Sequence, residues 1–426
     1  MTGREAWPRL AVALILAFAA CGKPADAPSP GLPADFTAGR PYFVRKPFPT
    51  DWRQLRKAPG SFAKARKWGP LYDLRQADLS ALDLSGRAAE LGMSFFDTVT
   101  KWPAALPEGF DPVQVLASNR DPGLGLRGLQ ARGLSGRGVA VAIIDTPLLL
   151  EHAEYAGRIL FYGEVNAWGP ANFHGTLVAS ILAGRTCGVA PEAEIYYVGS
   201  HNYDADRAKG TMTPNVGHYA KALDLLLELN RRLPEDRRIR VVSISAGWGP
   251  KDPGGRAMDR AVRRAAAAGI FVVSANIFDS FSPGFWFWGF DRAGREDPND
   301  LASARILGRE EWVSQVAGRD GFDGFYKKRL DRAGPIELLL VPEGSKTVAQ
   351  AGGPDEYGFY RMGGWSSVCP FIAGLYALAC QVKPDVTPEI FWRAALATGD
   401  PAPVPAGKST YPGRYVNPSR LIESLR

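Results

Sequence analysis

The sequence predicts an α/β fold of three layers, with helices on both faces of a mainly parallel sheet and an N-terminal extension before it. From about residue 121, short apolar segments alternate with helical patterns, which is typical of parallel strands joined by right-handed crossovers. The 426-residue chain is 46% hydrophobic and 22% charged, so it contains enough apolar sequence to bury a core. Residues 363–382 carry no charge, as expected of a helix buried on all sides.

Four segments are predicted as strands of the sheet. Residues 139–144 (VAVAII) form an apolar run that ends at Asp145, which is typical of a strand buried on both faces. A second strand follows the turn GVAP in EIYYVGS, and the third and fourth cover 239–245 and 270–274. Between them, helical patterns span 219–233 and 257–268.

The uncharged segment 363–382 is also long enough to cross a bilayer. Its Gly, Ser, Pro and Gln residues dilute the apolar character, so a buried central helix is the better interpretation.

The N-terminus predicts an export signal over residues 1–20. Two arginines precede eleven apolar residues at 10–20, which are too few to span a bilayer as a helix. Ala-Ala-Cys21 resembles the lipobox of bacterial lipoproteins, although Phe18 stands where Leu is usual. We therefore expect a lipid anchor at Cys21 and a place in the cell envelope, in the periplasm or at the outer membrane. A soluble secreted form after ordinary cleavage is the alternative.

Two segments separate Cys21 from the predicted α/β domain. Residues 21–39 are rich in Pro and small residues and predict an extended tether. Residues 40–120 form a basic extension, because 40–69 hold nine Lys or Arg and one acid, a net charge of +8, while the whole chain carries +7. The basic part contacts anionic lipid or polysaccharide, or it is a solvated face that covers the main domain. Nucleic acid is not an expected partner outside the cytoplasm.

Three cysteines remain after Cys21. Cys369 and Cys380 fall on one predicted helix, eleven residues and about 16 Å apart, which is too far for a disulfide. Cys187 has at most one partner, and no C-x-x-C spacing predicts a zinc site. No metal site is therefore proposed.

Three segments, in the order Asp, His, Ser, resemble the subtilase family of serine proteases. GVAVAIIDT resembles the family's strand that ends in an Asp, here Asp145, although Pro147 replaces the usual Gly. HGTLVASILAG followed by GVAP matches the family's His motif at His174. GGWSSVCPFIAG resembles the family's serine motif, in which the nucleophile lies four residues before a proline, as Ser366 lies before Pro370.

The serine motif departs from the family pattern at three positions. Trp365, Ser367 and Cys369 replace the usual Thr, Met and Ser. Ser367 is the only rival nucleophile, and the spacing to Pro370 favours Ser366. The resemblance covers about 122–426, so we interpret 121–426 as a subtilisin-like peptidase domain and 278–332 as an insertion.

The resemblance implies a serine endopeptidase that cleaves protein or peptide substrates through an acyl-enzyme. A serine hydroxyl needs an adjacent base, and a carboxylate behind the imidazole holds its tautomer and stabilises the imidazolium. Asp145, His174 and Ser366 are the predicted triad. The chemistry requires no cofactor. The family also allows a structural calcium ion, but no acidic loop here specifies one.

Two further sites follow from the resemblance. Asn276 is the candidate side-chain donor to the oxyanion, although it comes early after its strand, and an ordinary turn asparagine is the alternative. Ser245, Ala246 and Gly247 resemble the edge segment on which the family binds substrate by β-addition.

Three alternatives bear on the function. A pseudoprotease would keep the groove as a lipid-anchored binding protein without turnover. An α/β-hydrolase esterase is disfavoured because no G-x-S-x-G surrounds Ser366. Residues 22–120 are a candidate inhibitory propeptide, with processing near residue 120. The remaining histidines, His152, His201 and His218, are interpreted as structural.

Overall fold

A six-stranded parallel sheet forms the centre of the protein, in the order β1-β6-β7-β5-β10-β11. The computed structural model describes residues 41–43, 66–68, 71–206, 210–275, 285–306, 337–406 and 409–426. The strands are β1 (Tyr42–Phe43), β6 (Ile159–Val165), β7 (Glu194–Ser200), β5 (Ala140–Asp145), β10 (Ile239–Ile244) and β11 (Phe271–Ser274). The predicted parallel sheet is confirmed.

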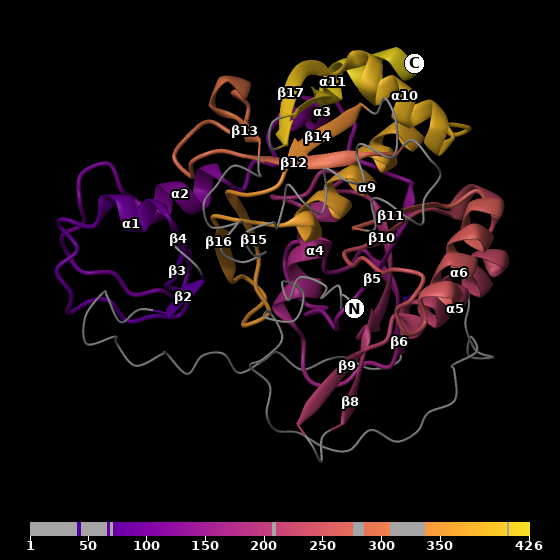
Figure 1. Ribbon diagram of the computed structural model, residues 1–426, viewed down its shortest axis with the longest axis horizontal. Coiled ribbons are helices and arrows are strands. Elements are labelled where there is room, and N and C mark those ends of the chain that lie inside the picture. The colour runs from indigo at the N-terminus through magenta and orange to yellow at the C-terminus, as the bar shows by residue number, and fades with distance from the viewer. Residues whose placement is uncertain are drawn as a thin grey trace, which may run out of the picture.

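Alternate residues of β5 pack against helices on opposite faces of the sheet. Val141 and Ile143 belong to the core that contains α4 (Phe173–Ala183) and α9 (Trp365–Val382). Ala142 and its neighbours face a second core with α5 (Gly217–Arg232) and α6 (Gly255–Ala267). Figure 1 shows these two helical layers with the sheet between them. The three-layer α/β/α architecture is therefore confirmed.

Helix α9 is the buried central helix that the uncharged segment predicted. Its length and composition would suit a membrane span, but 78% of it is buried inside the protein. It packs against α4, β10 and β14 (Leu338–Pro342). The apolar side chains are therefore already covered by protein.

A second sheet, in the order β13-β12-β14-β18-β17, extends the body beyond β11. Its strands are β13 (Arg305–Ile306), β12 (Phe287–Asp291), β14, β18 (Ser409–Tyr415) and β17 (Asp400–Ala406). Strand β12 lies within the segment that we interpreted as an insertion, yet it pairs in parallel with β14. That part of the segment thus belongs to the framework of the fold.

A third sheet joins the N-terminal extension to the body, in the order β15-β16-β4-β3-β2. The body supplies β15 (Lys346–Ala349) and β16 (Tyr357–Tyr360). The extension supplies β2 (Arg66–Trp68), β3 (Leu71–Asp73) and β4 (Ser94–Asp97), with α1 (Ala88–Gly92) and α2 (Pro112–Ser118) beside them. Since β4 pairs with β16, the extension shares a sheet with the strand that leads toward Ser366.

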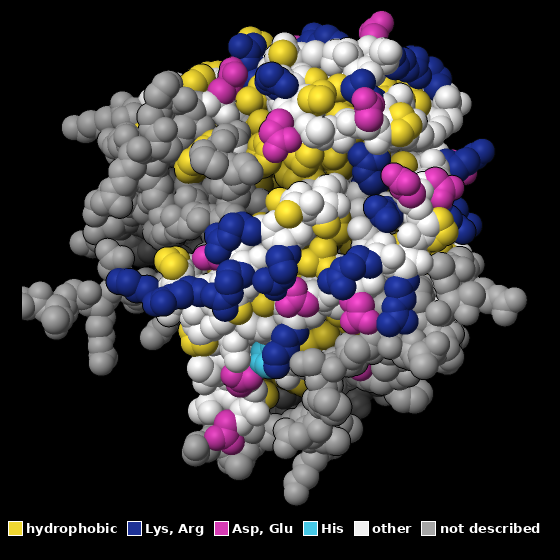
Figure 2. All heavy atoms as spheres, turned by 90° about the vertical axis from the view of Figure 1, so that its right-hand side faces the viewer, with side chains coloured by type: hydrophobic (Ala, Val, Ile, Leu, Met, Phe, Trp, Pro, Cys, Tyr) yellow, Lys and Arg dark blue, Asp and Glu magenta, His cyan; other side chains and the backbone are white. Residues whose placement is uncertain are grey.

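The remaining elements lie at the periphery. They are α3 (Leu126–Ala131), the hairpin β8 (Tyr203–Asp206) and β9 (Thr211–Pro214), η2 (Glu235–Arg237), η3 (Leu301–Ser303), α10 (Pro388–Thr398) and α11 (Pro418–Leu425). Figure 2 shows Lys and Arg side chains gathered on the side covered by α5 and α6, where Arg256, Arg260 and Arg263 are exposed.

Cys187, Cys369 and Cys380 are all free and buried. Cys369 and Cys380 share α9, as expected, and Cys187 forms no disulfide. Burial raises the pKa of the Cys187 and Cys369 thiols, with Glu154 adding to the effect at Cys187. These side chains therefore act as apolar packing groups rather than nucleophiles.

Candidate active site

Asp145 is the last residue of β5, at the carboxyl edge of the parallel sheet. Its side chain is almost fully buried, with 2% exposed. Oδ1 accepts hydrogen bonds from the Thr146 backbone N–H at 2.7 Å and the Thr146 hydroxyl at 3.2 Å. The carboxylate is thus held in one orientation at the edge where open α/β folds place their sites.

His174 lies in the first turn of α4, and local sequence explains why the helix begins there. Asn172 is the N-cap residue, and its side-chain oxygen accepts the His174 backbone N–H at 2.9 Å. Gly175 follows because a Cβ at this position would lie 2.2 Å from both the Thr146 carbonyl oxygen and the Tyr197 hydroxyl. The His-Gly pair therefore lets α4 approach the end of β5 closely.

The structure brings His174 and Asp145 together. The Nδ1 and Oδ1 atoms lie 2.7 Å apart. Since a carboxylate only accepts, Nδ1 donates the hydrogen bond, and Nε2 is left as the basic atom of the neutral ring. Burial by itself lowers the pKa of His174. The charge of Asp145 and its hydrogen bond raise this pKa by more than burial lowers it, so the pKa lies above its ordinary value.

Ser366 lies in the first turn of α9, after two glycines that the backbone requires. A Cβ at Gly363 would lie 2.0 Å from the Glu343 carbonyl oxygen, and Gly364 has a φ of +72°. Gly364 provides no side-chain cap. The Ser367 N–H donates to the Gly364 carbonyl at 2.9 Å, so the N–H groups of Trp365 and Ser366, together with the helix dipole, are the ones that can stabilise an oxyanion.

Pro370 explains how Ser366 is fixed to the sheet. A proline four residues on has no N–H to donate to the Ser366 carbonyl, so the usual helical hydrogen bond is absent. The hydroxyl of Ser245 donates to that carbonyl instead, at 3.1 Å. Ser245 directly follows β10, which lies next to β5, so this bond holds the start of α9 at the same edge of the sheet as Asp145.

The structure separates the two serines of the motif. Ser367 is 2% exposed, and its Oγ lies close to Gly363, whereas Ser366 is half-buried. Among the residues that the structure describes, no hydrogen bond joins the Ser366 hydroxyl to His174. Burial thus disfavours Ser367 as a nucleophile, and the third member of the predicted triad is placed at the edge without its bond to the base.

Trp365 replaces a small residue of the family pattern, and β12 accommodates it. Its ring meets that of Trp288 edge to face, with centroids 5.4 Å apart. Neither Trp288 nor the bond from Ser245 to Ser366 was predicted from the sequence. Proline at the fourth position after a helical serine is the signal that predicts a free carbonyl there.

The other predicted site residues divide into two groups. Asn276 and Cys21 lie outside the described residues. Ala246 is half-buried and Gly247 exposed, so the backbone of this segment is accessible where a substrate strand would add.

The three remaining histidines have partners of their own. Buried His152 bonds the Glu356 carbonyl at 2.9 Å, and burial lowers its pKa. His201 stacks on Trp168, and His218 pairs with Asp204 at 2.7 Å. Among the described residues, no group of three or more His, Cys, Asp or Glu side chains could hold a metal ion.

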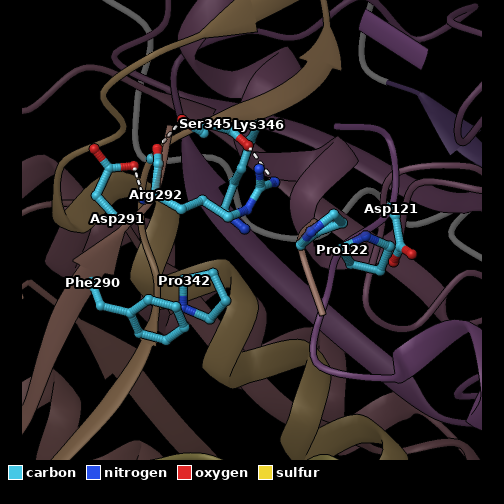
Figure 3. Close-up of a pocket in the computed structure, with 10 residues that line it drawn as sticks. Asp121, Pro122, Phe290, Asp291, Arg292, Pro342, Ser345 and Lys346 are labelled. Atoms are coloured by element: carbon cyan, nitrogen blue, oxygen red, sulfur yellow. Dashed lines mark hydrogen bonds between the residues drawn. The ribbon is translucent and has the colours of Figure 1, made fainter. Parts of the chain in front are cut away.

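A small pocket lies elsewhere in the body, beside the residues that directly follow the N-terminal extension (Figure 3). Ten residues line it: Asp121, Pro122, Phe290, Asp291, Arg292, Pro298, Pro342, Gly344, Ser345 and Lys346. The guanidinium of Arg292 donates hydrogen bonds to the Asn119 side chain and to the carbonyls of Ser345 and Glu296. None of the predicted triad residues lines this pocket.

Comparison with protein families gives a match to the subtilase family over residues 136–276. This segment is subtilase-like. It contains Asp145 and His174 with the elements that hold them, and it ends before Ser366.

Curated relatives agree with this match. The chain is 26% identical over 260 residues to the subtilase-type proteinase psp3 of Schizosaccharomyces pombe, covering 59% of this chain and 49% of that protein. It is 25% identical over 289 residues to the subtilisin-like protease PopC of Myxococcus xanthus (60% and 54%) and 27% identical over 282 residues to the serine protease AprX of Bacillus subtilis (60% and 60%). The chain spans about half the length of the first relatives it matches.

A solved structure, that of the prenylagaramide maturation protease PagA, aligns with a TM-score of 0.47 and 17% identity, over 71% of this chain and 98% of that one. The three curated relatives are all named as proteases or proteinases.

Proposed function

We propose that this protein is a serine endopeptidase with Asp145, His174 and Ser366 as its catalytic triad. The observation that carries the proposal is the 2.7 Å hydrogen bond between Asp145 and His174 at the carboxyl edge of the sheet. Ser366 lies in the first turn of a buried helix at the same edge, and its carbonyl accepts a hydrogen bond from Ser245. The subtilase-like segment supports this assignment of the acid and the base.

Each group has one role in the proposed reaction. Nε2 of His174 takes the proton of the Ser366 hydroxyl as Oγ attacks the peptide carbonyl, and it then gives that proton to the leaving amine. Asp145 keeps Nδ1 protonated and stabilises the imidazolium. Water attacks the resulting acyl-enzyme with His174 again as the base, which releases the acid and restores Ser366.

Groups next to the triad are proposed to bind the oxyanion and the substrate backbone. The Ser366 N–H and the positive end of the α9 dipole are proposed to stabilise the charge that develops on the carbonyl oxygen, and Asn276 is the proposed side-chain donor. Residues 245–247 are proposed to bind the substrate backbone as an added strand. Because Gly247 is exposed, an extended peptide can reach this segment.

Export and lipid attachment at Cys21 are part of the proposal. The signal-like segment 1–20 supports them, and one relative, from a Thermus species, is named an extracellular serine proteinase. We expect the native N-terminal peptide to begin at an acylated Cys21, and the Cys21→Ser variant to be found in the soluble fraction. Mass spectrometry of the N-terminal peptide tests this, and an unmodified terminus elsewhere would contradict it.

A fluorophosphonate probe tests the triad directly. The wild-type protein should be labelled once, at Ser366, and should hydrolyse an unstructured protein such as casein. Ser366→Ala should lose both properties. Ser367→Ala is the matched control, since it removes the adjacent hydroxyl, and it should still be labelled.

A pseudoprotease that binds peptides without turnover is the second candidate. It is favoured by the departures at Trp365 and Ser367 and by the missing hydrogen bond between the Ser366 hydroxyl and His174 among the described residues. Folded wild-type protein that takes no probe, but binds extended peptides, would establish this function instead.

A further inference from the structure

The N-terminal extension places a half-buried cation, Arg75, against the residue that precedes His174. This residue follows β3, and 15% of its side chain is exposed. Nε and Nη2 donate to the two carboxylate oxygens of Asp73 at 2.8 and 3.1 Å. This two-point pairing fixes the plane and direction of the guanidinium.

The same guanidinium contacts the segment that carries His174. Its Cζ lies 5.7 Å from the centroid of the Phe173 ring. Phe173 is the first residue of α4 and directly precedes His174, whose ring it meets edge to face at 6.1 Å. A shift of Phe173 therefore moves the start of α4 and the imidazole with it.

Arg75 also contacts the strand that leads to Ser366. Nη1 donates to the Tyr360 hydroxyl at 2.5 Å, and Cζ lies 5.0 Å from the centroid of the Tyr360 ring. Tyr360 ends β16, six residues before Ser366. The rings of Tyr360 and Phe173 are nearly parallel, with centroids 6.5 Å apart. One guanidinium therefore contacts both the residue before the proposed base and the strand before the proposed nucleophile.

The surrounding contacts keep the extension in place. The backbone of β4 pairs with that of β16, and Tyr357 and Thr98 exchange two hydrogen bonds. Asn119 donates to the Gly294 carbonyl at 2.6 Å and accepts from Arg292 at 2.6 Å. These bonds lie within buried or half-buried surroundings, where leaving a polar group without a partner is destabilising.

We propose that Arg75 is a positioning residue for the catalytic groups, which makes residues 71–120 a permanent part of the active peptidase rather than a propeptide to be removed. The proposal rests on the proposed function. Arg75 acts through Phe173 and Tyr360 and does not itself touch the substrate. Misplacement of catalytic groups by about 1 Å lowers turnover by about 100-fold, so we expect kcat to respond and KM to change little.

The experiment compares variants that separate position from stability. Removing Arg75 alone would take away the guanidinium that bonds both carboxylate oxygens of buried Asp73, which is destabilising. The test variant is therefore the neutral pair Asp73→Asn with Arg75→Gln, together with Arg75→Lys, which keeps the charge without the planar fork. Arg120→Gln is the control, because Arg120 stacks on Tyr357 at 3.8 Å, at the other end of β16.

Activity per labelled active site is measured well below the melting temperature of each variant. We expect the neutral pair to lower kcat and the rate of fluorophosphonate labelling by roughly 10- to 100-fold, with KM within about 2-fold of wild type. The kcat of Arg75→Lys should lie between that of the neutral pair and that of wild type. Arg120→Gln should have the kcat of wild type. If the neutral pair fails to fold, Arg75→Lys decides, and a wild-type kcat for it would overturn the proposal.

Two outcomes keep this proposal apart from that of the triad. Wild-type rates in the folded neutral pair, or an equal loss in Arg120→Gln, would overturn the role of Arg75 while the peptidase activity stands. If wild-type protein takes no probe, the peptidase proposal fails. The low-field proton resonance of His174 Nδ1 then tests Arg75 without turnover, since it should shift in the Arg75 variants but not in Arg120→Gln, and an unchanged resonance would contradict the proposal.

Discussion

At the scale of single residues, the partner of His174 decides when this imidazole can act as a base. Asp145 raises the pKa of His174 through its charge and a hydrogen bond, against the opposite effect of burial. The base must be neutral to accept the serine proton. Activity should therefore fall as the pH drops through the pKa of His174, which lies above the ordinary His value of about 6.5.

The variant Asp145→Asn tests this dependence. We expect kcat/KM to fall by about 10⁴-fold, because an amide no longer enforces the productive tautomer. The acidic limb of the pH profile should also move to lower pH, since burial then acts on His174 without the carboxylate. A fluorogenic peptide measured from pH 5 to 9 provides the profile.

Asp204→Asn is the control for this prediction. Asp204 pairs with His218 at the same distance of 2.7 Å, in an exposed position, and its loss should leave the profile unchanged. An unshifted acidic limb in Asp145→Asn would show that another group titrates in that range.

At the scale of elements, the site depends on how closely helices approach strand ends. Gly175 lets α4 lie against the end of β5, with no room for a methyl group beside the Thr146 carbonyl. The Gly363–Gly364 pair does the same for α9 beside Glu343. Each helix start carries one residue of the proposed triad, so the small residues of these motifs set its distance from the sheet.

Gly175→Ala should therefore displace α4. We expect a loss of about 1–3 kcal/mol in the free energy of unfolding, as for other overpacked sites, and a lower kcat, because His174 moves with the helix. Urea unfolding and turnover of the same preparation measure the two effects.

The matched control is Gly128→Ala in α3. Gly128 is exposed, and a Cβ there would meet nothing within 4 Å, so alanine should be neutral or stabilising by up to about 1 kcal/mol. Equal effects of the two substitutions would contradict the argument from close approach.

At the scale of the whole molecule, the junction between the extension and the body contains an unusual charge. Lys346 is 8% exposed and lines the pocket of Figure 3. Burial, with a further contribution from Arg292, lowers its pKa to about 7. The Phe371 ring, 4.8 Å from Nζ, is its aromatic contact. Lys346 thus links the protonation of this junction to global stability.

The sign of this linkage predicts how stability varies with pH. Between about pH 7 and pH 10 the unfolded lysine keeps its proton while the folded one has lost it, so stability should rise with pH, by up to about 1.4 kcal/mol per pH unit. Lys346→Met should remove this slope and be more stable than wild type near and below pH 7. Urea unfolding at several pH values measures it.

Lys383→Met is the control, because 34% of the Lys383 side chain is exposed beside Asp385. It should keep the wild-type slope. A slope that persists in Lys346→Met would assign the linkage to another group.

Local sequence patterns predicted the elements of the central body. Apolar runs and helical periodicity identified β5, β10, β11, α5, α6 and the buried α9, and the motif contexts singled out Asp145 and His174, which the structure joins. These features depend on residues close together in the chain, where burial on one face or on all sides leaves a periodic signal.

Only the tertiary structure decided how distant segments combine. Sheet pairing between β4 and β16, the place of β12 beside β14, and the bond from Ser245 to Ser366 all join residues far apart in the sequence. Backbone hydrogen bonds between strands are nearly independent of side-chain type, so they leave no local signature. For that reason the sequence alone indicated only an extension over residues 71–120. In the fold, these residues pair with β16 and contact the segments that carry the proposed base and nucleophile.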